Sequence, residues 1–108
     1  MGKIYKIIVY VPVDHAEQVR EVLGKAGAGK TDNGKYDSAS FSSRGIGRFR
    51  PLKGAKPAIG QIGKLEEVEE ERIEAVVEGF YLQTVLDAVK KAHPYEEPGI
   101  DVIELKSI

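Results

Sequence analysis

The chain has 108 residues and contains no cysteine. It therefore forms no disulfide, no thiolate metal site and no cysteine nucleophile. It also lacks an excess of positive charge, because 16 lysines and arginines stand against 17 aspartates and glutamates, which gives a net charge of −1. General affinity for nucleic acid needs a clear basic excess, so we expect no nucleic-acid partner.

Long apolar runs are missing as well. No stretch approaches the length of a membrane-spanning helix, and the first residues lead directly into a strand-like segment rather than a signal peptide. We therefore expect no membrane partner and a cytoplasmic location. With 42% hydrophobic and 31% charged residues, a chain of this length predicts one globular domain over 1–108.

The N-terminal third predicts a strand followed by a helix. Residues 4–11 are mostly β-branched or aromatic and end at Pro12, as in a central strand. Asp14, with Glu17 three residues later, predicts a capping box at the start of a helix. Apolar residues then recur at spacings of three and four until the glycine-rich residues 24–29 end the helix.

The remainder predicts a second strand–helix–strand half. We predict strands over 36–43, 72–78 and 100–105 and a helix over 80–93. Between the second and third strands, residues 44–65 are rich in glycine and proline and predict a long loop, of which 46–52 can extend the hairpin.

This order of elements predicts an α+β fold, the ferredoxin-like βαββαβ sandwich, with both helices on one face of an antiparallel sheet. In that topology three segments meet at one end of the molecule. They are the turn 12–15, the loop 44–65 and the turn 93–98. We expect any functional site at this end.

One segment has the residue pattern of a phosphate-binding loop but not the strand and helix that such a loop needs on either side. Residues 24–31 fit the pattern G-x-x-x-x-G-K-[ST], which needs a strand before it and a helix after it. Here a helix precedes the string, and Asn33-Gly34 interrupts any helix after it. We therefore interpret 24–31 as a helix end and a turn.

Two other sets of residues are candidates for binding. His15, His93 and Glu96 offer the nitrogen and oxygen ligands of a divalent metal, the one cofactor we consider, although they are equally compatible with plain surface positions. The basic side chains of the loop can bind an anion or a protein partner, or be neutralised by the acidic run 66–71. Those basic residues are Arg44, Arg48, Arg50 and Lys53.

No catalytic constellation is evident. The serines of 38–43 follow no nucleophile elbow, and the adjacent Glu96 and Glu97 point apart in extended structure. These patterns favour a protein that is not an enzyme.

Several segments together resemble a known family. They are 5–12, 27–29, 40–43, the Gly-Ile-Gly-Arg-Phe-Arg-Pro-Leu-Lys-Gly run 45–54, residues 59–66 and the His-Pro-Tyr-Glu-Glu-Pro run 93–98. They resemble the domain inserted in YqfO-type proteins, the Nif-three-like proteins also known as GTP cyclohydrolase I type 2 homologues. That inserted domain is similar to CutA and to PII signalling proteins, which form trimers through their sheets.

The resemblance implies a function for the chain standing alone. In the longer relatives the dinuclear metal site belongs to the flanking domains, so their hydrolase-like activity is not expected here. PII-like proteins bind effectors near the loop and the turn that correspond to 44–65 and 93–98. We therefore predict a non-catalytic binding or regulatory module, a homotrimer that binds a small anion, a divalent metal or a partner protein at the end formed by 12–15, 44–65 and 93–98.

Two alternatives stay open. The first is a metal-dependent enzyme, or an accessory subunit of a YqfO-type hydrolase. The second is a metal-tolerance role like that of CutA.

Overall fold

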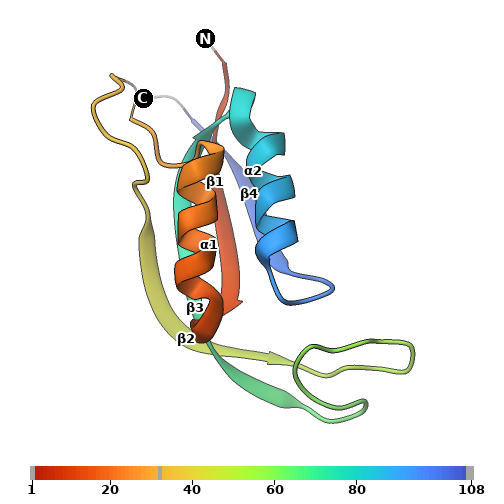
Figure 1. Cartoon of the computed structure of the whole chain (residues 1–108). Coiled ribbons are helices and arrows are strands. Elements are labelled where there is room, and N and C mark those ends of the chain that lie inside the picture. The colour runs from red at the N-terminus through yellow and green to blue at the C-terminus, as the bar shows by residue number, and fades with distance from the viewer. Residues whose placement is uncertain (1, 32, 107–108) are drawn as a thin grey trace.

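The computed structural model describes residues 2–31 and 33–106, which form a sheet covered on one face by two helices (Figure 1). The elements are β1 (Ile4–Pro12), α1 (Val13–Ala26), β2 (Phe41–Phe49), β3 (Glu66–Glu78), α2 (Gly79–Ala92) and β4 (Gly99–Leu105). The strands lie in the order β2-β3-β1-β4, and each neighbouring pair is antiparallel. This topology confirms the predicted ferredoxin-like α+β fold. No helix of the described residues is long and apolar enough to cross a membrane.

The core lies between the helices and the sheet. Alternate residues of the two central strands face the helices, and the apolar stripe of each helix closes over them. The largest fully buried side chains are Ile7, Val9, Val11, Val19, Leu23, Ile73, Val77, Val85 and Val89. Each contributes about 1.5–3 kcal/mol through burial, and together they fix which sheet face carries the helices.

The ends of α1 differ in part from the prediction. The capping box at Asp14 is wrong, because Pro12 occupies the N-cap position and no side chain caps the helix. Asp14 instead lies in the first turn, where its charge complements the helix dipole. At the other end Gly27 adopts the left-handed conformation with φ of 117°, so the phosphate-loop string contains a helix C-cap, as interpreted.

The hairpin of β2 and β3 is longer than predicted and displaced along the sequence. β2 runs over Phe41–Phe49 rather than 36–43, and β3 begins at Glu66 rather than at 72. The register places Arg44 opposite Glu71 and Arg48 opposite Glu67. Opposite charges across neighbouring strands stabilise the pairing, so residues 44–49 of the predicted loop and the acidic run 66–71 both form strand.

We call residues 44–49 and 66–71 the arm, because this part of the hairpin curves away from the helices (Figure 1). Its base is fixed to α1 by a buried charge. Glu71 is only 8% exposed and accepts a hydrogen bond from Arg20, which also donates to Ser42 at 3.3 Å and to Glu17 at 3.0 Å. The orientation of the arm relative to α1 therefore depends on Arg20.

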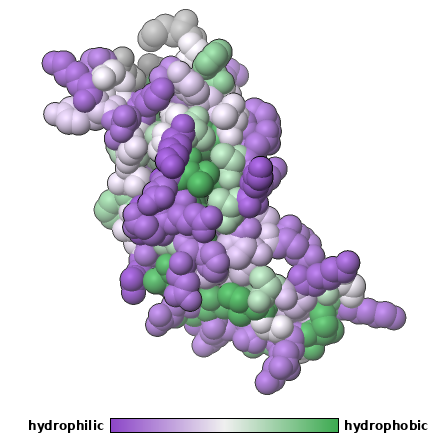
Figure 2. Space-filling view, in the orientation of Figure 1, coloured by the Kyte–Doolittle hydropathy of each residue, from purple (hydrophilic) through white to green (hydrophobic). Residues whose placement is uncertain are grey.

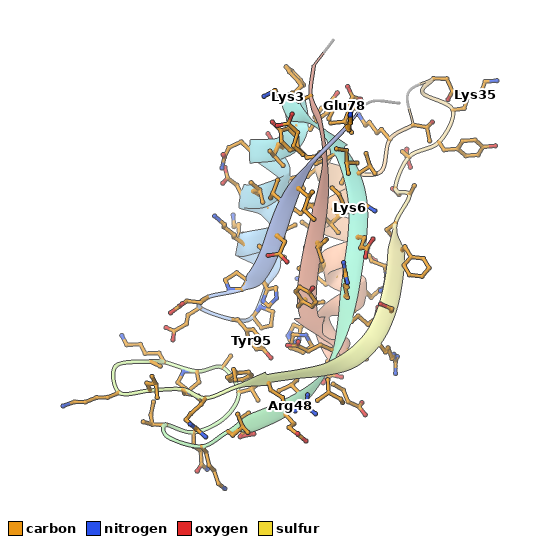
Figure 3. All side chains as sticks on the ribbon, turned by 180° about the vertical axis from the view of Figure 1, so that it is seen from behind. Lys3, Lys6, Lys35, Arg48, Glu78 and Tyr95 are labelled. Atoms are coloured by element: carbon orange, nitrogen blue, oxygen red, sulfur yellow. The ribbon has the colours of Figure 1, made fainter. Side chains whose placement is uncertain are left out.

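The sheet face opposite the helices carries both charged and apolar side chains (Figure 3). Lys6 and Arg72 both pair with Glu74, at 3.3 and 3.0 Å. Ile8 also lies on this face but is only 3% exposed. The exposed apolar side chains of this face are instead Phe41, Val76 and Ile103, at 67%, 38% and 48%.

We predict that Arg20→Ala lowers the free energy of unfolding by about 3 kcal/mol, because it removes the hydrogen-bonded cation of the buried Glu71 carboxylate and leaves only the exposed Arg44, 3.9 Å away. The matched variant Arg48→Ala removes an exposed pair with Glu67 and is expected to cost less than about 1 kcal/mol. Urea denaturation of both variants measures the difference. Equal losses would contradict the role assigned to Arg20.

Candidate functional site

The structure brings the three predicted segments together at the end of the molecule that carries the arm. The ring of His93 bonds through Nε2 to the carbonyl oxygen of Tyr10 at 2.7 Å, which joins the turn after α2 to the end of β1. The rings of Phe49 and Tyr95 meet edge to face with centroids 5.7 Å apart. The backbone N–H of Lys56 donates to Oε1 of Glu96 at 2.8 Å. The arm, its loop and the turn thus form one assembly.

The loop 50–65 is folded back on itself at the tip of the arm (Figure 1). The N–H of Gly63 donates to the carbonyl of Pro51 at 2.7 Å, and the N–H of Ala55 donates to Leu52 at 2.9 Å. Pro51 is buried. These bonds give the glycine-rich segment a defined shape, with Gly54, Gly60 and Gly63 at positive φ.

A pocket of about 830 Å³ lies between this loop, the arm and the turn after α2. Its lining includes rings and apolar side chains, with charged groups of both signs. The apolar members include Tyr10, Phe49, Pro51, Leu52, Ile59 and Tyr95, and the charged members are Arg48, Arg50, Lys53, Glu70, Glu96 and Glu97. Figure 2 shows hydrophobic side chains gathered over the arm and its loop. Such a mixed lining suits a ligand with an apolar body and polar ends.

His93 is a structural link rather than a free ligand. It is 6% exposed, its Nε2–H donates to Tyr10, and its Nδ1 accepts the N–H of Tyr95 at 3.1 Å. Burial lowers the pKa of His93 below 6.5, against opposing effects of the Tyr10 carbonyl and the Glu70 charge. The neutral ring therefore fixes the start of the turn 93–98.

Tyr95 extends from this turn toward the arm (Figure 3). Its hydroxyl donates to Oε2 of Glu70 at 3.2 Å, and its ring lies 5.1 Å from that of His93. Burial, followed by the charge and hydrogen bond of Glu70, raises the pKa of Tyr95 to about 12. Tyr95 is thus a neutral hydrogen-bond donor that joins the turn to β3.

The predicted metal ligands do not form a ligand set. Both ring nitrogens of His93 are occupied, and Glu96 accepts the backbone N–H of Lys56. His15 keeps a buried Nδ1 without a hydrogen-bond partner in the described part of the chain. Within residues 2–31 and 33–106, no three histidine or carboxylate side chains gather in a metal-binding arrangement. The expected site at His15, His93 and Glu96 is therefore not assembled.

The predicted anion-binding residues are divided between two places. Arg44 lies 3.9 Å from Glu71, and Arg48 pairs with Glu67 at 2.8 Å, so both are neutralised along the arm. Arg48, Arg50 and Lys53 line the pocket, whereas Arg44 does not. The alternative of neutralisation by the acidic run thus applies to Arg44 and Arg48.

Sequence reasoning missed Tyr10 and Glu70 as members of the site, whereas Phe49 lies within the predicted segment 44–65. Glu70 stands in the acidic run 66–71, which the sequence suggested only as a neutralising partner of the basic loop. Its place in the pocket follows from the register, which sets Glu70 opposite Gly45 and Pro12. No local signal in the sequence distinguishes it from its neighbours.

The lining of the pocket offers charged groups and hydroxyls. Of the described residues that line it, none is a serine, threonine, cysteine or histidine. Its polar groups are the charged ends of arginine, lysine and glutamate and the hydroxyls of two tyrosines. These groups can hold a ligand through ion pairs and hydrogen bonds.

Comparison with known proteins confirms the resemblance predicted from the sequence. No protein-family model matches the chain. A GTP cyclohydrolase 1 type 2 homolog of Bacillus subtilis is 50% identical over 97 residues, which are 90% of this chain and 26% of that protein. A Mycobacterium tuberculosis protein of the same name is 43% identical over 100 residues, 93% of this chain and 26% of its own length. The chain thus spans about a quarter of the curated relatives it matches.

Comparison with solved structures supports the same relationship and the same fold. A Bacillus cereus protein related to NIF3 superposes with a TM-score of 0.84 and 43% identity, over 98% of this chain and 26% of that one. CutA1 of Pyrococcus horikoshii has a TM-score of 0.68 at 17% identity, over 96% and 85% of the two chains. GlnK of B. subtilis has a TM-score of 0.62 at 20% identity, over 96% and 86%. At these identities the last two show a shared fold.

We predict that the lowered pKa of His93 makes the free energy of unfolding decrease as the pH falls. Because the folded pKa lies below 6.5, the unfolded chain binds the proton first as the pH falls. The stabilisation from neutral His93 is complete above about pH 6.5 and declines as the pH falls toward the lowered pKa. Urea denaturation between about pH 7.5 and 5 should show a steeper decline for wild type than for His93→Gln. Parallel curves would contradict this account.

We also predict that Glu70→Gln lowers the pKa of Tyr95 from about 12 while leaving it above 10.0, because burial, the largest cause, remains. Ultraviolet difference titration measures this shift, with Tyr95→Phe to assign the signal and circular dichroism to follow the fold. The control is Glu69→Gln, an exposed neighbour outside the pocket lining. Equal curves for wild type and Glu70→Gln would refute the coupling.

Proposed function

We propose that this chain is a non-catalytic binding module, acting in the cytoplasm as a homotrimer, whose ligand occupies the pocket between the loop 50–65 and the turn 93–98. The observation that carries the proposal is the pocket itself. Its walls come from segments far apart in the sequence, and contacts of Phe49, Tyr95, Glu96 and Lys56 hold them together. Contacts that hold the loop and the turn around an open pocket favour a binding role for that pocket.

The basic rim supports a ligand with an anionic group. Arg50 and Lys53 line the pocket, and no carboxylate oxygen of the described residues lies within 4.0 Å of their charged nitrogens. They are therefore available to a phosphate or carboxylate, in contrast to Arg44 and Arg48. A divalent metal is less compatible with this end, because the expected ligands do not gather.

The trimer is supported by the open sheet face. Phe41, Val76 and Ile103 are exposed on the face that the helices leave uncovered. An apolar surface of this kind is typical of contacts between subunits. The likeness to CutA and PII-like folds supports the same assembly.

A second role as an accessory module of a larger hydrolase is favoured by one observation. The relatives are nearly four times as long as the segment they share with this chain. In this role the chain would act together with the three quarters of the relatives that it does not match.

We predict that analytical ultracentrifugation at micromolar concentration gives the mass of three chains. Ile103→Glu should dissociate the assembly, because it places a charge on the open face. The matched control is Val102→Glu, the adjacent residue of β4, which is 40% exposed and lies on the helix side of the sheet. A monomeric wild type, or equal effects of the two variants, would refute this assembly.

The binding role is tested by a thermal-shift screen of nucleotides, phosphates and divalent metals. An anionic ligand that raises the melting temperature of wild type should lose most of its effect with Arg50→Ala/Lys53→Ala. The double variant Lys90→Ala/Lys91→Ala removes the same charge from the exposed end of α2, outside the pocket, and should respond like wild type. Equal responses of the two double variants would exclude the pocket rim as the anion site.

A further inference from the structure

Glu70 stands out among the carboxylates of β3. On this strand Glu67 pairs with Arg48, Glu71 with Arg20, and Glu74 with Lys6. Glu70 is half-buried in the pocket lining, yet no lysine, arginine or histidine nitrogen of the described chain lies within 4.0 Å of its carboxylate. A partly desolvated anion without a counter-ion favours the binding of a cation.

The position of the Glu70 carboxylate is fixed from two sides. Oε2 accepts the hydroxyl of Tyr95, and the other side of the group lies against Gly47, where an added Cβ would overlap Oε1. The glycine of β2 thus leaves the space that the carboxylate fills. The anion is held at the pocket wall rather than extending into solvent.

Aromatic rings line the same pocket. Tyr10, Phe49 and Tyr95 contribute to its wall, and the face of such a ring attracts positive charge. Tyr10 already has the guanidinium of Arg72 above its ring, 6.0 Å from the centroid. The rings and Glu70 therefore offer both kinds of contact that organic cations prefer.

The basic side chains of the pocket leave this position free. Arg48 is engaged by Glu67, and Arg50 and Lys53 are exposed residues at the start of the loop. An anionic group can meet these loop residues, but one placed beside Glu70 would be repelled. The unpaired basic groups Arg50 and Lys53 thus lie on the loop, whereas Glu70 lies on β3.

We propose that the pocket binds a positively charged nitrogen, an ammonium or guanidinium group on an apolar stem, with Glu70 as its counter-ion and Tyr10, Phe49 and Tyr95 beside it. The apolar loop residues Pro51 and Leu52 accommodate the stem. This inference rests on the proposed function of the pocket as a ligand site. The same cation can come from a free small amine or from a lysine or arginine of a second copy of this chain.

The charge of the ligand is tested with three probes of equal length: n-pentylamine, 1-pentanol and pentanoate. Titration of the full chain, followed by nuclear magnetic resonance shifts, should show the amine binding at least about tenfold more tightly than the alcohol. Glu70→Gln should remove roughly that tenfold advantage. Glu69→Gln makes the same change of charge one residue away, outside the pocket lining, and should leave the advantage intact.

A second pair of variants tests the position of the carboxylate without changing its charge. Gly47→Ala displaces the end of the Glu70 side chain, whereas a Cβ at Gly45 meets nothing within 4 Å. Both glycines lie in β2, so Gly45→Ala controls for the substitution in the strand. Amine binding should weaken severalfold in Gly47→Ala and remain unchanged in Gly45→Ala.

Oligomer mass distinguishes the sources of the cation. If a second copy supplies it, the free amine does not bind to the assembly, and Glu70→Gln dissociates the assembly whereas Glu69→Gln does not. The inference is overturned if the amine does not bind and Glu70→Gln does not dissociate the assembly. It is also overturned if the amine binds Glu70→Gln as tightly as wild type, or if pentanoate binds more tightly than the amine. If pentanoate binds more tightly than the amine, the pocket is still a ligand site. If no probe and no compound of the thermal-shift screen binds, the proposed function itself is refuted.

Discussion

The antiparallel pairing of β2 with β3 is the constraint on which the functional end of the molecule depends. Its register sets the basic run of one strand against the acidic run of the other, as in the pairs Arg44–Glu71 and Arg48–Glu67. Opposite charges stabilise a two-stranded ribbon beyond the edge of the helices, where little apolar burial is available. The ribbon carries the loop 50–65 to the turn after α2, so the pocket exists because the arm does.

A buried polar network gives this arrangement its precision. At the base of the arm, Arg20 compensates Glu71; at the turn, neutral His93 bonds to Tyr10 and orients the backbone of Tyr95. Hydrogen bonds of buried groups are costly to break, because each broken bond leaves a desolvated donor or acceptor. The contacts of Tyr95 with Phe49 and Glu70 therefore form between positions already fixed by the framework.

The order of elements and the convergence of three segments could be predicted from the sequence, because both follow from local periodicity and from topology. The core strand ending at Pro12 and the helix ending at Gly27 carry their own signals. The boundaries of β2 and β3 could not be predicted, since a glycine-rich run indicates a loop in isolation and a run of glutamates lacks the apolar alternation of a strand. The two runs form strands only as partners, and a partner 17 to 33 residues away is not visible to a local pattern.

The same reasoning explains why the candidate site was only partly predicted. Arg48, Arg50, Lys53 and Glu96 were found because they stand in conspicuous runs, yet a run does not reveal which charges neutralise one another. Arg44 and Arg48 are compensated within the arm, while Glu70, with no distinguishing neighbour in the sequence, keeps an uncompensated charge in the pocket. The specificity of such a pocket depends on the charges that remain after the fold has paired the others. Among the described residues that line the pocket, the charges without an ion pair are positive at Arg50 and Lys53 of the loop and negative at Glu70 of β3 and at Glu96 and Glu97 of the turn. A ligand that matches both signs must itself carry both charges.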